Sequence, residues 1–216
     1  MSTVPSVPEA ALPDDLLPVH RVLRAAWYGV LLGIVIELLV LVVQSWQAQM
    51  PDALRIAADT VQKMSWSALV CAAIAAGQAA ARTHASVAAL FGLIGAPVAF
   101  LLARALHKAV LSALGADAGS AAVQWLGAGV KAIEYALLGA VIVWLAERKA
   151  RWTSYAACGA AIGATTYVLT SFWLPTPGDP LQRAVTEVLH PVGCTLAVFL
   201  TLQLNRHLKT GDATND

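Results

Sequence analysis

Charge is scarce in this 216-residue sequence. Asp, Glu, Lys and Arg together make up only 12% of the residues, whereas hydrophobic residues make up 58% and the mean hydropathy is +0.67. A soluble domain typically has about a quarter charged residues and no more than half apolar ones. The formal net charge of +1 also lacks the strong positive balance that favours nucleic-acid binding. We therefore expect an integral membrane protein without a nucleic-acid partner.

The usual catalytic and cofactor-binding signatures are absent as well. The sequence has no Gly-x-Ser-x-Gly, no His-Glu-x-x-His, no phosphate-binding loop and no TVGYG-like filter. Its three cysteines lie inside apolar segments, without metal-ligand spacing, and are typical of small buried residues. Hydrolase and nucleotide-driven activities therefore lack support, and we expect no cofactor.

The N-terminal segment lacks the features of a secretory signal. Residues 1–20 contain four prolines and three acidic residues, and the first basic residue is Arg21. A signal peptide would need a basic start followed by an apolar core. We interpret 1–20 as a flexible Pro-rich tail, 21–205 as the membrane domain and 206–216 as a polar C-terminal tail.

Apolar runs predict six membrane-spanning helices, and therefore an all-α, polytopic membrane fold. The fourth run is apolar over only 12 residues and must be extended backwards, past two charges, to be long enough to cross. The predicted spans are 27–46, 64–81, 86–103, 125–146, 152–173 and 181–204. The longer connections at 51–63 and 107–124 have partly helical patterns, which indicate segments lying along the membrane interface.

Tryptophans give an independent measure of these spans. They bracket the segments 27–46, 125–144 and 152–173, with separations of 19, 19 and 21 residues. At about 1.5 Å per residue, these lengths of roughly 28–32 Å match the hydrocarbon core, and tryptophan prefers its two interfaces. The midpoints of the first two brackets lie beside Glu37 and Glu134, so both carboxylates are predicted near the middle of the bilayer.

Basic residues predict the orientation. With six spans, eight Lys and Arg residues lie on one side and five on the other, which favours cytoplasmic termini. We expect a bacterial inner (plasma) membrane location, with the lipid bilayer and a second copy or another membrane protein as partners. Two short matches, LLGIVI with LLGAVI and SALVCAAIAAG with SYAACGAAIGA, suggest a 3+3 inverted repeat, although Ala/Gly/Leu-rich helices also match by chance.

Glu37 is the one charge in the first span. Gly29 and Gly33 lie on the same helical face, and small residues at this spacing let another helix approach closely. We therefore expect Glu37 at a helix–helix contact, with Glu134 and His190 as candidate partners. Further small residues predicted to pack helices are Gly77, Gly159 and Gly163.

Lys131 and Glu134 are three residues apart in the fourth span and can pair on one helical face. One interpretation is an intrahelical ion pair that lowers the cost of inserting two charges. The other makes Glu134 a proton or cation ligand that Lys131 tunes, because charges inside membranes are commonly functional.

The sixth span carries a polar stripe. Arg183, Glu187 and His190 are spaced by four and three residues and share one face. Pro191 follows the histidine and predicts a kink, as does Pro97 in the third span. The stripe fits either a gate or proton relay, or a kinked packing helix whose histidine bonds a neighbouring carbonyl. Glu187 and His190 are also weak metal-ligand candidates, since a second Glu-x-x-His motif is lacking.

Three functions remain open at this point. The first is a secondary transporter or channel for an ion or small solute. Its polar path would be lined by Glu37, Lys131, Glu134, Arg183, Glu187 and His190. The second is a non-catalytic assembly factor or complex subunit, in which the glutamates form structural ion pairs with Lys131 and Arg183. The third, a membrane-embedded enzyme or metalloprotein, is disfavoured by the missing signatures.

Overall fold

The computed structural model describes residues 17–48, 50–81, 84–113, 115, 124–173 and 179–212, with side chains from Val19 to Leu204. Most of the predicted N-terminal tail, most of residues 174–180 and the end of the predicted C-terminal tail lie outside the described residues. The described part contains helices and no strand. The helices are α1 (Leu17–Trp46), α2 (Ala53–Ala81), α3 (Ala85–Ala113), α4 (Gln124–Glu147), α5 (Trp152–Trp173) and α6 (Pro180–Asp212).

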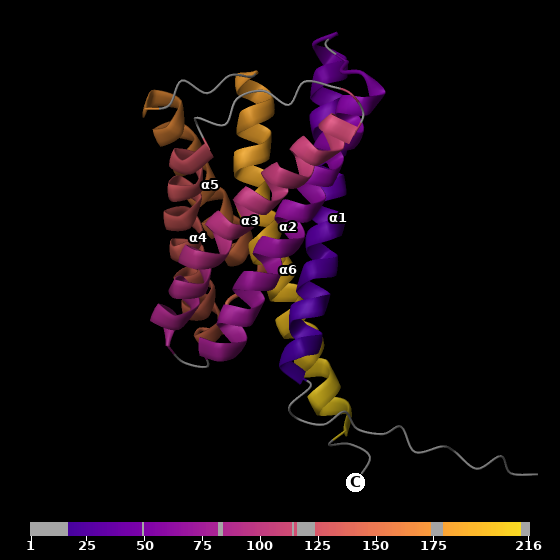
Figure 1. The fold of residues 1–216 in the computed structure, drawn as a ribbon. Helices are drawn as coiled ribbons and strands as arrows, with labels where there is room; N and C mark the ends of the chain where they lie inside the picture. Colours follow the sequence, from indigo (N-terminus) through magenta and orange to yellow (C-terminus); the bar gives the residue numbers. More distant parts are fainter. Residues whose placement is uncertain are drawn as a thin grey trace, which may run out of the picture.

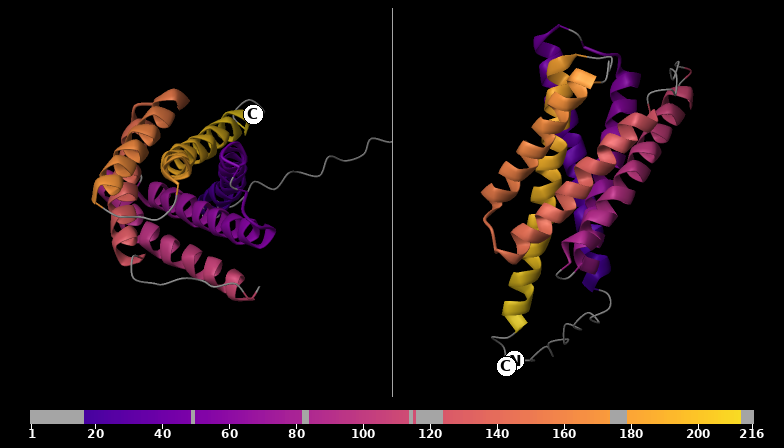
Figure 2. Two further views of the ribbon diagram at one scale, coloured as in Figure 1. Left: turned by 90° about the horizontal axis from the view of Figure 1, so that it is seen from above. Right: turned by 90° about the vertical axis from the view of Figure 1, so that its left-hand side faces the viewer.

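The helices run up and down in one bundle (Figure 1). The start of α1 and the end of α6 lie at the same end of it. At the opposite end, which we call the Trp46 end, α1 ends, and α2, α4 and α6 begin. Helices α1 and α3 flank α2, while α6 lies between α1 and α5 (Figure 2). Gln47 at the end of α1 donates a hydrogen bond to Asp179, just before α6, over 3.0 Å.

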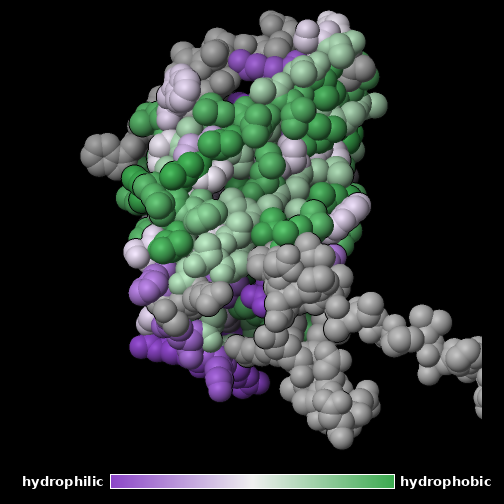
Figure 3. All heavy atoms as spheres, turned by 60° about the horizontal axis from the view of Figure 1, so that its bottom comes forward, coloured by the Kyte–Doolittle hydropathy of each residue, from purple (hydrophilic) through white to green (hydrophobic). Residues whose placement is uncertain are grey.

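Five helices, α1, α2, α3, α4 and α6, are long and apolar enough to cross a membrane, which indicates a multi-pass membrane protein. Apolar side chains cover much of the bundle face that Figure 3 shows. Helix α5 is not among the five, because serine, threonine and tyrosine interrupt its apolar residues. The all-α prediction is confirmed, while a sixth span, the inverted repeat and the orientation stay predictions.

Tryptophans at the helix ends differ from the one in the core. Trp46 and Trp125 are exposed near the Trp46 end, and Trp144 and Trp152 are exposed near the other. Trp66 of α2 is buried instead, with edge-to-face contacts to three rings. These rings are Phe100, Tyr135 and His190, with centroid distances of 6.0, 5.5 and 6.3 Å. The core thus forms around a tryptophan rather than around aliphatic residues alone.

Helix α2 begins eleven residues earlier than the second span was expected to begin, at Ala53 rather than Met64. The prediction of a separate interfacial segment at 51–63 is wrong, because most of that segment is the first part of α2. The charged residues of this segment interrupt the apolar run in the sequence. In the bundle, however, Lys63 pairs with Glu37 and Asp59 pairs with His107. Helix α3 likewise continues to Ala113, past the expected end of its span.

Glycines let several helices approach backbone to backbone. A Cβ at Gly33 would lie 2.6 Å from Met64 Cα of α2, and one at Gly159 would lie 2.7 Å from Val192 Cα of α6. Gly29 meets α2 in the same way, Gly163 faces the Glu187 carbonyl of α6, and Gly77 meets Phe91 of α3. No larger side chain fits at such contacts without moving a helix. Pro97 and Pro191 lie within α3 and α6, which continue on either side.

Candidate functional site

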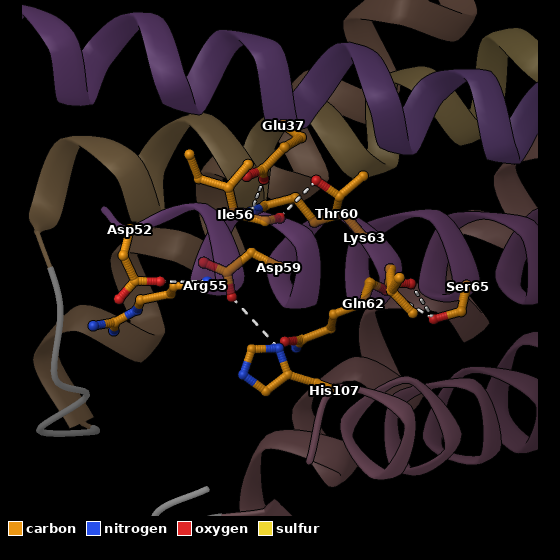
Figure 4. Close-up of polar contacts among 11 residues, drawn as sticks. Glu37, Asp52, Arg55, Ile56, Asp59, Thr60, Gln62, Lys63, Ser65 and His107 are labelled. Carbon is orange, nitrogen blue, oxygen red and sulfur yellow. Dashed lines mark hydrogen bonds and ion pairs between the residues drawn. The ribbon is translucent and has the colours of Figure 1, made fainter. Parts of the chain in front are cut away.

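Glu37 forms an ion pair with Lys63 of α2, and Figure 4 shows the two side chains directed toward each other. Glu37 is only 4% exposed. The close approach of α1 to α2 at Gly33, one turn before Glu37, places the carboxylate within reach of the lysine. This pair carries no net charge, so it needs no further ion.

The expected meeting of Glu37 with Glu134 is not found. Helices α1 and α4 make no contact within the described residues, and α2 contacts both of them. The sequence did contain a signal for the true partner, because Asp59, Lys63, Ser67 and Cys71 recur at intervals of four along one face of α2. Lys63 interrupts the apolar run and so resembles the boundary of a span, which hides this polar face of α2.

Lys131 lies between two glutamates. Its Nζ is 2.7 Å from Oε2 of Glu134, the predicted partner on the same helix, and it also forms an ion pair with Glu187 of α6. The Glu134 side chain has no exposed surface, and that of Glu187 is 26% exposed. We call these three residues the charge cluster. With all three ionised, the charge cluster carries a net charge of −1.

Glu134 has one oxygen without a hydrogen bond. Its Oε2 accepts from Lys131, and the Thr166 hydroxyl of α5 interacts with the carboxyl group. However, Oε1 is buried and has no hydrogen-bond partner of normal length among the described residues. Buried polar atoms usually have a partner, so a proton, water molecule or ion would be favoured beside this oxygen.

His190 bonds to α2 rather than to another charge. Its Nδ1 lies 3.0 Å from the Ser67 hydroxyl, and the histidine is only 6% exposed. One turn further along the same two helices, the sulfur atoms of Cys71 and Cys194 are 3.3 Å apart. The partner of the histidine is therefore a hydroxyl and not the backbone carbonyl that was expected. Together, the histidine–serine and cysteine–cysteine contacts fix the register of α2 against α6.

Arg183 lies apart from the glutamates. Its guanidinium lies over the ring of Tyr167 in α5, 5.8 Å from the centroid, and it forms no ion pair with a described acidic residue. The expected structural pair between Arg183 and a glutamate is thus absent from the part of the chain that the structure describes. Of the six predicted path residues, Lys131, Glu134 and Glu187 are joined to one another by ion pairs.

A polar pocket of about 260 Å³ lies beside the charge cluster, between α2, α3, α4 and α6. This volume is large enough for several water molecules. Sequence reasoning missed the pocket residues on α2 and α3, because they lie outside the expected spans or inside an apolar run. The pocket is lined by Asp59, Gln62, Lys63, Trp66, Phe100, Ala103, Arg104, Lys131, Thr186, Glu187 and His190.

A second hollow lies on the other side of the charge cluster, between α4 and α5. This α4–α5 groove has a volume of about 740 Å³ and mostly apolar walls. Glu134 lines the groove, whereas Lys131 and Glu187 line the polar pocket. The Glu134 side chain has no exposed surface, so the charge cluster faces the polar pocket and not the groove. The groove is lined by Leu126, Val130, Ile133, Glu134, Leu137, Ala161, Ile162, Thr165, Thr166, Leu169 and Thr170.

The described residues contain no group of three or more His, Cys, Asp or Glu side chains arranged to hold a metal ion. Glu187 and His190, the weak metal candidates, have different partners, Lys131 and Ser67. No known protein family matches the sequence, and neither a curated protein nor a solved structure is significantly similar to it.

Proposed function

We propose that the protein is a small membrane transporter that carries protons, with the charge cluster as its proton-binding site. The observation that carries the proposal is the excess of one carboxylate in the charge cluster, two glutamates sharing Lys131. Hydrocarbon gives an uncompensated ion almost no solvation, so one further positive charge is favoured there. A proton on Glu134 supplies that charge.

A proton suits this site better than a metal cation does. Hard metal ions need several oxygen ligands at once, whereas a proton needs a single oxygen. The oxygens that face Lys131 are already occupied, and the lysine ammonium repels a second cation placed beside them. Among the buried side-chain atoms of the charge cluster that the structure describes, Oε1 of Glu134 is the one without a hydrogen-bond partner. One proton on that atom neutralises the charge cluster.

The position of the charge cluster indicates how protons would reach it from the Trp46 end. Lys131 and Glu187 each lie seven residues inside their helices from the Trp46 end, which corresponds to roughly 10 Å of helix. The polar pocket reaches them from this region of the bundle. Protons would therefore approach Glu134 through the pocket and its water, with Lys131 and Glu187 as the last charged groups before it.

Proton flux into proteoliposomes tests this function. Purified protein is reconstituted with an internal pH dye, and a potassium diffusion potential drives proton entry. We expect flux above that of protein-free vesicles, and loss of this flux in Glu134→Gln, which cannot bind the proton. Glu147→Gln, an exposed glutamate on the same helix, is the matched control and should retain the flux. Wild-type flux at the protein-free level, or full flux in Glu134→Gln, would refute the proposal.

A second candidate function rests on the Glu37–Lys63 pair. This pair is neutral and buried between two helices, as expected in a non-catalytic assembly factor or complex subunit with structural ion pairs. Purification in mild detergent distinguishes this candidate. A stoichiometric membrane-protein partner would support it, and a lone monomer that conducts protons would exclude it.

A further inference from the structure

The polar pocket is lined by more positive than negative side chains. Among its described lining residues, the basic ones are Lys63, Arg104 and Lys131, and the acidic ones are Asp59 and Glu187. The glutamates of α1 and α4 that pair with the two lysines do not line the pocket. A small molecule in the pocket therefore meets a surface with one excess positive charge, which favours an anion.

Arg104 of α3 lacks an acidic partner. Its guanidinium lies over the ring of Phe100, 5.4 Å from the centroid, and it forms no ion pair with a described acidic residue. The attraction between cation and ring keeps the guanidinium beside the pocket, because Phe100 lines it too. A guanidinium presents its N–H donors in a planar fork that matches a carboxylate. Arg104 is therefore placed to bind a carboxylate in the pocket.

The two lysines add further donors to the same pocket. Among the described residues, Lys63 donates one hydrogen bond to Glu37, and Lys131 donates one each to Glu134 and Glu187. An ammonium group has three N–H donors, so each lysine keeps at least one. Both side chains are mostly buried, with exposed fractions of 15% and 12%, and both line the pocket. The spare donors are thus available to water or to an anion there.

The other walls select a small organic anion with one charge. Trp66, Phe100 and Ala103 supply apolar surface, and the first two rings pack edge-to-face. The volume of about 260 Å³ is below the roughly 300–1,000 Å³ typical of drug-sized sites. Asp59 and Glu187 would repel a second negative charge on the ligand. The pocket therefore fits an anion that combines one carboxylate with a compact apolar body.

We propose that the polar pocket binds a small monocarboxylate. Arg104 binds the carboxylate, Lys63 and Lys131 offer further N–H donors, and the apolar body lies against Trp66 and the Phe100 ring. The inference goes beyond the proposed function and does not depend on it, because Arg104 is outside the charge cluster that binds the proton.

Isothermal titration calorimetry in dodecylmaltoside tests the site with benzoate and benzamide, two probes of one shape. Benzoate is anionic at neutral pH, whereas benzamide is neutral. We expect benzoate to bind at least about tenfold tighter than benzamide, because only benzoate forms charge-assisted hydrogen bonds with Arg104. Inorganic phosphate should bind more weakly than benzoate, because it lacks an apolar body and carries more than one negative charge at neutral pH.

Variants separate the guanidinium from the pocket. Arg104→Gln should remove the preference for benzoate, and it should fold, because Arg104 is exposed. Arg55→Gln is the matched control and should keep the preference, since Arg55 is an exposed arginine near the same end of the bundle that does not line the pocket. Gln62→Trp fills the pocket from α2 without changing a charge and should abolish benzoate binding.

Four results would overturn the inference. The first is equal affinity of benzoate and benzamide for the wild type, and the second is a benzoate preference that survives in Arg104→Gln. The third is unchanged benzoate binding in Gln62→Trp, which would place the anion on the outer surface of the bundle. The fourth is tighter binding of phosphate than of benzoate.

Failure here is distinguishable from failure of the proposed function. Glu134→Gln should lose the proton flux but bind benzoate at least as tightly as the wild type, because it removes a negative charge near the pocket. Proton flux without a benzoate preference would keep the transporter and remove the anion site. A benzoate preference without proton flux would do the reverse.

Discussion

The count of charges in the cluster makes an asymmetric prediction for stability. Lys131→Met leaves Glu134 and Glu187 without their shared cation, whereas Glu134→Gln leaves a neutral one-to-one pair of Lys131 with Glu187. With a proton on Glu134, as the proposed function requires, the ionised pair is Lys131 with Glu187, and a glutamine at position 134 resembles the neutral acid that it replaces. Removal of one partner of a buried pair typically costs about 3–5 kcal/mol.

We therefore expect Lys131→Met to lower the free energy of unfolding by about 3–5 kcal/mol, and Glu134→Gln to change it by no more than about 1 kcal/mol. The two substitutions are expected to differ in their effect on the free energy of unfolding because the charge cluster has two carboxyl groups and one ammonium group. Unfolding in mixed micelles of dodecylmaltoside and sodium dodecyl sulfate, followed by tryptophan fluorescence, measures both changes. A Glu134→Gln variant as unstable as Lys131→Met would refute the charge count, and so would a Lys131→Met variant as stable as the wild type.

Two further predictions concern helix packing. Gly139→Ala should destabilise the bundle, because its Cβ would lie 3.0 Å from the Ala88 carbonyl carbon of α3, whereas Gly129→Ala on the same helix meets nothing within 4 Å. Gly129→Ala should be neutral or stabilise the bundle by up to about 1 kcal/mol, since alanine favours helix. Thermal unfolding of the two alanine variants in detergent measures this difference. Oxidation with diamide should join Cys71 to Cys194, whose sulfurs are 3.3 Å apart, and peptide mapping without reductant should find this link. Equal melting of the two glycine variants, or a link through the third cysteine instead, would contradict the packing.

The helices were largely predictable, because long apolar runs have few other stable solutions than helix. What failed was the use of charges as span boundaries. Lys63 was placed outside the second span, although it lies inside α2 and pairs with Glu37. A charge inside a helix is tolerated wherever a partner helix neutralises it, and the sequence alone does not say which helix that is.

The candidate site was predictable only where its residues share a helix. The pairing of Lys131 with Glu134 follows from their spacing of three residues. Glu187 joins them only through the register of α6 against α4, which depends on packing over the whole bundle. The glycine spacing in α1 indicated a close helix contact, but nothing local identified α2 as the neighbour.

Infrared difference spectroscopy of the purified protein detects a proton on Glu134 directly, because the C=O stretch of a protonated carboxylic acid is separate from the bands of a carboxylate. We expect such a band at neutral pH in the wild type, its loss in Glu134→Gln and its persistence in Glu147→Gln. Absence of the band in the wild type, or its persistence in Glu134→Gln, would show that the charge cluster does not hold a proton on Glu134.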